Sequence, residues 1–220
     1  LITPDFINSR YMSKLPLHAD QVDAYTVEGN TVKIFKNRDS ISYLYHVSPP
    51  EFNLSEDHYE LLNLARTVLA EHKPKEEEFL DPSRMRITFF NIGRDLLLEL
   101  AQHKGYPITY DEVEKLALLL VRYTVGFGLL EVLLLDPKIQ DVVINSPIGQ
   151  TPLFIVHQDY DECVTNIIAS HDDSEAWASK FRLISGRPLD EANPVLDTEL
   201  SIPGARARVA VMNKPLNPYG

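Results

Sequence analysis

At 220 residues, 44% of them hydrophobic, the chain is long enough to bury a core in one large domain or two small ones. Its formal net charge of −11, from 32 acidic and 21 basic residues, argues against nucleic acid or an anionic membrane surface as a partner, because both would repel the average surface. A single cysteine, Cys163, excludes an intrachain disulfide and favours a reducing, cytoplasmic compartment.

The amino-terminal part is predicted to form a small β meander followed by helices. From about Tyr25 to Tyr45, β-prone runs flank a turn rich in polar residues, and Glu28-Gly29-Asn30 marks a second turn. Further along, Asn53 or Ser55 can cap a helix that Pro74 stops. The buried face of this helix is predicted to carry Leu62, Ala65 and Leu69.

Two more helices are predicted in the middle of the chain. Asp81-Pro82 supplies an N-cap and a proline at the first helical position, and Gly105 ends that helix. Thr109 and Glu112 form a capping box for the next helix. The inner stripes are predicted to be Met85, Phe89, Ile92, Leu96 and Leu100 in the first helix, and Val113, Leu116, Leu120 and Tyr123 or Thr124 in the second.

After Gly126-Phe127-Gly128 the sequence changes to short β-prone stretches, with one helix from about Asp172 to Ser185. Trp177, Phe181 and Ile184 share one face of that helix, so Trp177 is predicted to lie in the core. The expected fold class is α+β. A small β meander and helices form an amino-terminal subdomain over residues 1–107, and a mixed α/β, sandwich-like subdomain covers residues 108–220.

The longest apolar run and the ends of the chain bear on whether it crosses a membrane and whether it is part of a longer protein. The run from Leu116 to Val121 is far shorter than the roughly 20 residues that span a bilayer, so we expect a soluble chain without a signal peptide. The chain begins at Leu1 and stops at Gly220 inside a segment rich in proline and asparagine. We therefore expect a piece of a longer protein.

No catalytic motif is recognised. None of the nine glycines precedes a lysine, as a phosphate-binding P-loop requires. Gly126-Phe127-Gly128 follows a predicted helix and lacks the third glycine of a dinucleotide fingerprint. The seven histidines are scattered, and Cys163 has no base in its local sequence, so neither a metal site nor covalent catalysis is expected.

Two acidic segments are interpreted as solvated turns. The run from His157 to Glu162 gathers carboxylates beside an imidazole and could bind a hard cation, but it lacks the spacing and glycine of a calcium loop. The side chains of Asp190 and Glu191 diverge because the residues are adjacent, so they cannot act together on one bond.

The chain has one basic group that could bind phosphate. It comprises Arg206 and Arg208, with Arg187 upstream. On a strand, Arg206 and Arg208 would share one face, opposite Ala205, Ala207 and Val209. Two guanidinium groups on one face suit phosphate oxygens. The alternative is a set of salt bridges to acids such as Asp197 or Glu199, and the residues alone favour that alternative.

Long strings of this sequence resemble the amino-terminal region of archaeal type II/type IV secretion ATPases. RYTVGFGLLEVLLLDPKIQDVVINSPIG (122–149) is similar to the segment that opens their second amino-terminal subdomain, and WASKFRLISGRPLDEANPVLDTELSIPGARARVAV (177–211) matches the same proteins. YLYHVSPPEF (43–52) and EEEFLDPSRMRITFFNIGRDLL (76–97) extend the resemblance, which covers roughly residues 25–220.

The resemblance implies a cytoplasmic, membrane-associated hexamer that acts on a membrane-embedded platform protein to assemble filaments or drive secretion. Members join this region to a RecA-like motor that carries the Walker motifs and binds ATP and Mg²⁺. That motor is absent here, so the chain alone is expected not to hydrolyse ATP and to need no cofactor. The resemblance also implies that Arg206 and Arg208, and less directly Arg187, approach phosphates held by the motor.

Two other functions stay open. The chain could be a freestanding acidic interaction adaptor, which a downstream reading frame encoding a P-loop would exclude. It could also be a small hydrolase with an unrecognised carboxylate site, although no arranged acid–base set supports this.

Overall fold

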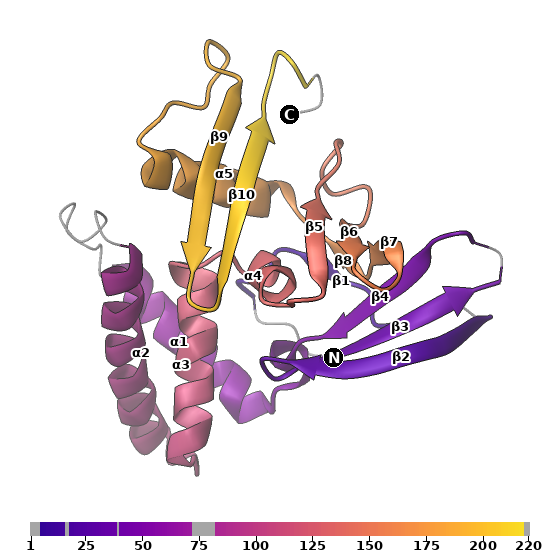
Figure 1. Cartoon of the computed structure of the whole chain (residues 1–220). Coiled ribbons are helices and arrows are strands. Elements are labelled where there is room, and N and C mark those ends of the chain that lie inside the picture. Colours follow the sequence, from indigo (N-terminus) through magenta and orange to yellow (C-terminus); the bar gives the residue numbers. More distant parts are fainter. Residues whose placement is uncertain (1–4, 16–17, 39, 72–81, 218–220) are drawn as a thin grey trace. The chain divides into compact units, whose positions relative to one another are not determined.

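The computed structural model describes residues 5–15, 18–38, 40–71 and 82–217 (Figure 1). The chain forms two compact units, each made of two separate segments. Unit 1 comprises Leu1–Ile7 and Pro50–Glu131, and unit 2 comprises Asn8–Pro49 and Val132–Gly220. Helices dominate unit 1 and strands dominate unit 2, so the fold class is α+β, as the sequence predicts.

Unit 1 contains a 3-10 turn, η1 (Pro50–Asn53), and the helices α1 (Glu56–Glu71), α2 (Pro82–Lys104) and α3 (Tyr110–Thr124). The predicted caps of α1 and α3 are confirmed. Ser55 Oγ accepts a hydrogen bond from the backbone N–H of His58, and Thr109 and Glu112 form both bonds of a capping box. The predicted inner faces of α1 and α3 are buried at Leu62, Ala65, Leu69, Val113, Leu116 and Leu120, whereas Tyr123 and Thr124 are only half-buried. Pro74 and Asp81, predicted to stop α1 and cap α2, lie outside the described residues.

The predicted inner stripe of α2 is wrong by about one residue. Ile92 is 47% exposed, whereas Gly93, Leu97 and Ala101 are buried. A Cβ added to Gly93 would lie 3.4 Å from Leu120 Cδ1, so the small residues of α2 let α3 approach closely. Neither α2 nor any other helix in the described ranges is long and apolar enough to cross a membrane.

Gly126-Phe127-Gly128 makes the tight connection between α3 and α4 (Leu129–Leu134). Gly128 has φ +58°, which favours glycine, and a Cβ on Gly126 would lie 2.5 Å from Glu131 Oε1. The buried Glu131 carboxylate accepts the backbone N–H of Phe127 at 3.0 Å and forms a two-pronged ion pair with Arg86 at 2.6 and 2.9 Å. Backbone conformation and close packing therefore explain why both positions are glycine, without a bound nucleotide.

A six-stranded sheet organises unit 2, in the order β2-β3-β4-β7-β6-β5. Its strands are β2 (Ala19–Val27), β3 (Asn30–Asn37), β4 (Tyr43–Ser48), β5 (Ile139–Val143), β6 (Phe154–His157) and β7 (Asp161–Thr165). The predicted meander is confirmed in β2, β3 and β4, with Glu28 and Gly29 at positive φ in the first turn. β4 then pairs with β7 in parallel, Tyr43 opposite Cys163.

The remaining elements of unit 2 are two strand pairs and a helix. β1 (Arg10–Tyr11) pairs with β8 (Ile167–Ile168), and β9 (Val195–Ile202) pairs with β10 (Ala205–Met212) as a hairpin. Helix α5 (His171–Ser185) crosses behind this hairpin in Figure 1 and contacts β9. Trp177 and Phe181 are buried, which confirms the prediction for Trp177, while Ile184 is only half-buried.

The compact units differ from the subdomains expected over residues 1–107 and 108–220. The predicted boundary falls between α2 and α3, which pack against each other in unit 1. The meander, placed by the sequence with the helices, instead joins the carboxyl-terminal strands through the β4–β7 pairing. Hydrogen bonding between distant strands decides this grouping, and no local pattern reports it.

Candidate phosphate-binding face

The three candidate arginines all belong to unit 2, on or beside the hairpin of β9 and β10. A Pro203-Gly204 turn joins the two strands, and Gly204 has φ +90°. In the antiparallel register, Arg206 lies opposite Ser201, and Arg208 lies opposite Glu199. The turn and the register therefore fix the positions of Arg206 and Arg208 along β10.

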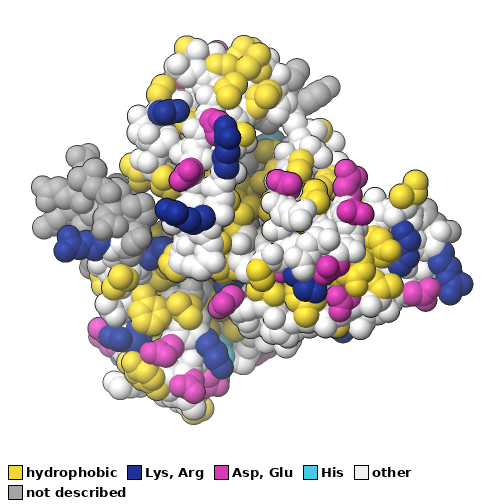
Figure 2. All heavy atoms as spheres, in the orientation of Figure 1, with side chains coloured by type: hydrophobic (Ala, Val, Ile, Leu, Met, Phe, Trp, Pro, Cys, Tyr) yellow, Lys and Arg dark blue, Asp and Glu magenta, His cyan; other side chains and the backbone are white. Residues whose placement is uncertain are grey.

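Alternation along β10 places both arginines on the exposed side of the hairpin. Arg206 and Arg208 are exposed, whereas Ala205, Ala207 and Val209 are half-buried. On β9, Leu196, Leu200 and Ile202 are buried. The predicted division of faces is confirmed, and Figure 2 shows basic and acidic side chains interspersed over the hairpin.

Arg208 is already occupied by a carboxylate. Its Nε donates to Asp197 Oδ1 at 3.0 Å and its Nη2 donates to Asp197 Oδ2, so the guanidinium engages both oxygens. The hydrogen bond from Arg208 is the main cause that lowers the pKa of Asp197, and the same bond raises the pKa of Arg208. For Arg208, the salt bridge that the sequence favoured is present in the structure.

Arg206 and Arg187 differ from Arg208. Arg206 is exposed and forms no ion pair within the described part of the chain. Arg187 follows Gly186, the left-handed C-cap of α5 at φ 63°, and its positive charge also lowers the pKa of Asp197. Asp197 therefore pairs with Arg208, while Arg206 is left available.

The chemistry that this face offers is anion binding. The exposed side of the hairpin carries Arg206 and Arg208 beside Asp197 and Glu199, and Arg206 has no ion pair within the described part of the chain. No group of three metal-ligating side chains occurs among the residues that the structure describes. The arrangement supplies charge and hydrogen-bond donors rather than a nucleophile or an acid–base pair.

A second titratable cluster, buried in unit 2, was missed by the sequence analysis. Asp136 Oδ2 accepts hydrogen bonds from Tyr25 at 2.7 Å and from Tyr45 at 2.8 Å, and Asp136 Oδ1 accepts the Lys138 N–H at 2.9 Å. His157 Nδ1 accepts the Asp159 N–H at 3.1 Å, which leaves Nε2 to donate to the Tyr25 hydroxyl at 3.0 Å.

This Asp136 cluster is a closed structural network. Asp136, Tyr45 and His157 are at most 2% exposed, so a substrate cannot reach them. Burial is the main cause that raises the pKa of both Tyr25 and Tyr45, with Asp136 adding to it, and burial lowers the pKa of His157. Its members come from four separate segments, so no local motif in the sequence could have found them.

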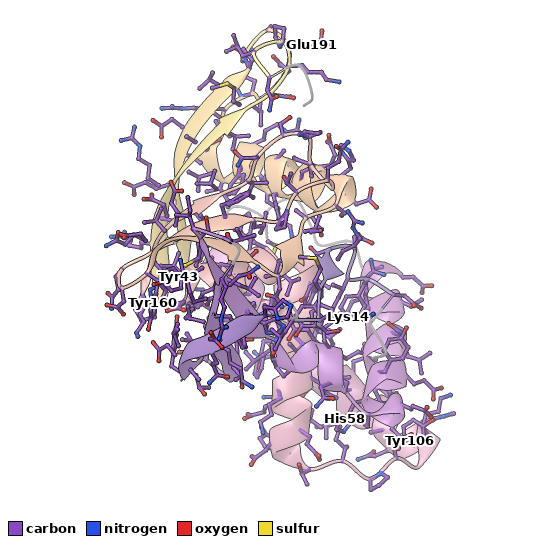
Figure 3. All side chains as sticks on the ribbon, turned by 90° about the vertical axis from the view of Figure 1, so that its right-hand side faces the viewer. Lys14, Tyr43, His58, Tyr106, Tyr160 and Glu191 are labelled. Atoms are coloured by element: carbon purple, nitrogen blue, oxygen red, sulfur yellow. The ribbon has the colours of Figure 1, made fainter. Side chains whose placement is uncertain are left out.

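The other sequence candidates have structural explanations. The run from His157 to Glu162 includes the end of β6, the turn at 158–160 and the start of β7. Tyr160 in this turn lies beside Tyr43 (Figure 3), with their ring centroids 5.1 Å apart. Asp190 Oδ1 accepts backbone N–H groups of Ala192 and Asn193, which makes a polar turn. Burial raises the pKa of the Cys163 thiol to about 11, so the thiolate is disfavoured.

Comparison with known protein families gives no match. Two archaeal proteins are similar to parts of the chain. Uncharacterized protein MJ0781 of Methanocaldococcus jannaschii is 26% identical over 124 residues, which cover 56% of this chain and 16% of that protein. Uncharacterized protein MJ1288 of the same organism is 28% identical over 107 residues, 47% of this chain and 41% of that protein. The matches thus span less than half the length of each relative.

Proposed function

We propose that this chain is the amino-terminal, non-motor region of an archaeal type II/type IV secretion ATPase. In this role its hairpin contacts the phosphates of a nucleotide held by the motor domain. The observation that carries the proposal is the exposed arginine face of β10, on which Arg206 is free of ion pairs within the described residues. An unpaired guanidinium on the surface of an acidic chain is suited to bind an anion.

The proposed mechanism is differential contact. A phosphate bound by the motor and reached by Arg206 and Arg208 would favour the closed arrangement of the two domains, and its hydrolysis would remove that contact. The chain would then transmit nucleotide state without hydrolysing ATP itself. ATP and Mg²⁺ belong to the motor domain in this scheme.

The proposal also covers oligomeric state, location and partners. The protein would act as a homo-hexamer in the cytoplasm, bound to the membrane through a platform protein. It would use neighbouring subunits and its own motor as partners, with no nucleic acid. Its archaeal relatives extend well beyond the segments that match this chain, which leaves room for a further domain in them.

The test is ATP hydrolysis by the protein that contains both this region and the motor. Replacing Arg206 and Arg208 together by alanine should lower turnover about ten- to a hundredfold, as expected for loss of charge-assisted phosphate contacts. Lysine at both positions should restore part of the rate, because it keeps the charge but loses the planar fork. Arg38→Ala is the control, since Arg38 is an exposed arginine paired with Asp20 on another part of unit 2.

Normal hydrolysis by the double alanine variant, combined with a lower melting temperature, would show that the arginines are structural. An adaptor function would instead be supported if the reading frame that follows this chain encodes no P-loop.

A further inference from the structure

The Arg208–Asp197 pair resembles the contact that a phosphate would make with Arg208. A carboxylate and a phosphate both present two oxygens to a guanidinium fork, and Asp197 uses both of its oxygens here. The two side chains are 79% and 46% exposed, so the pair is solvated and an exposed anion can displace it at small cost.

We infer that Asp197 regulates the proposed phosphate site by competing with phosphate for Arg208. The inference rests on the proposed function and adds a regulator to it. While Asp197 holds Arg208, only Arg206 is available to an incoming phosphate. Once phosphate takes Arg208, both guanidinium groups of β10 bind it together.

The position of Asp197 suits this exchange better than that of its neighbour Glu199. Glu199 lies directly opposite Arg208 in the strand register, yet the ion pair forms with Asp197, which lies opposite Ala210. Asp197 is also within the influence of the Arg187 charge.

Such a competitor makes the site selective for chains of phosphates. An anion that reaches only Arg206 makes no contact with Arg208, so it does not compete with Asp197. An anion long enough to extend along β10 reaches Arg208 as well and gains a second charge-assisted contact. The substrate class that fits is a polyphosphate ester such as a nucleoside triphosphate.

The experiment is a titration of the 220-residue chain with inorganic tripolyphosphate at constant ionic strength. The Nε–H signals of Arg206 and Arg208 are followed by NMR. Asp197→Asn removes the competing charge, and we expect it to tighten tripolyphosphate binding about two- to fivefold, the range set by an exposed ion pair. Glu199→Gln is the matched control, because it removes an equal charge on the same strand that is not paired with Arg208. It should give less than half of that gain.

A double-mutant cycle separates competition from general repulsion. In an Arg208→Ala background, Asp197→Asn should give no gain, because the contested group is gone. An equal gain in that background, or no gain from Asp197→Asn in the parent chain, would overturn the competition while leaving the phosphate site intact. Absence of any tripolyphosphate response at Arg206 and Arg208 would overturn the phosphate-binding role of the hairpin, on which the competition rests.

Discussion

Removing one hydroxyl from the Asp136 cluster should destabilise the protein measurably. The Tyr45 side chain is fully buried and donates to Asp136 Oδ2 at 2.8 Å. Tyr45→Phe keeps the ring and deletes this donor, so the buried carboxylate loses one of its hydrogen bonds. A hydrogen bond to a charged group contributes about 1.5–3 kcal/mol, and we expect the free energy of unfolding to fall by about that amount.

The measurement is urea denaturation followed by circular dichroism, supported by thermal melting. At roughly 2–4 °C per kcal/mol for a chain of this size, the melting temperature should drop by about 3–12 °C. Tyr25→Phe tests the same carboxylate oxygen from another strand, and it also removes the acceptor of the His157 Nε2 proton.

Tyr43→Phe is the control, because Tyr43 lies two residues from Tyr45 on β4 and shares its side of the strand. Its hydroxyl makes no hydrogen bond within the described part of the chain, so the change should stay within about 0.5 kcal/mol. If Tyr45→Phe were as mild as Tyr43→Phe, the Asp136 cluster would not stabilise the fold as we argue.

Three further outcomes follow from the structure. Trp177→Ala should cost about 3–5 kcal/mol, since the indole is buried, and a red-shifted, freely quenched emission from Trp177 in the folded parent would contradict this. Gly126→Ala should cost about 1–3 kcal/mol in urea denaturation, because the new Cβ would overlap Glu131 Oε1; unchanged stability would refute the close packing. Burial lowers the pKa of His157 below the ordinary 6.5, so on acidification the unfolded chain takes up a proton before the folded chain does. The stability that comes from keeping His157 neutral in the folded state is complete above pH 6.5 and is lost as the pH falls through the folded pKa. His157→Gln should therefore weaken the loss of stability between neutral and acidic pH, measured by urea denaturation across that range.

Local sequence was sufficient where the controlling atoms lie within a few residues of each other. The capping box at Thr109 and Glu112, the turn at Glu28-Gly29 and the glycine after α5 were all readable in this way. Strict alternation likewise placed Arg206 and Arg208 together on the exposed face of β10.

Periodicity failed where several faces of one element are apolar. The α2 segment has leucines at positions 96, 97, 98 and 100, so more than one stripe fits a helical period. Close approach of α3 at Gly93 selected the stripe that is buried, and only packing between helices could make that choice.

The sequence by itself predicted the meander, the helices α1, α2, α3 and α5, and which side of β10 carries charge, but it missed the short helix α4 after Gly128. Only the tertiary structure decided that β4 joins β7, that Asp136 gathers Tyr25 and Tyr45, and that Arg208 pairs with Asp197 rather than Glu199. The physical reason is the sequence distance between the interacting groups. Caps and turns are satisfied by neighbouring backbone groups, whereas a buried carboxylate or an unpaired strand edge must find its partners across the fold, in whatever segments the burial of apolar surface brings together.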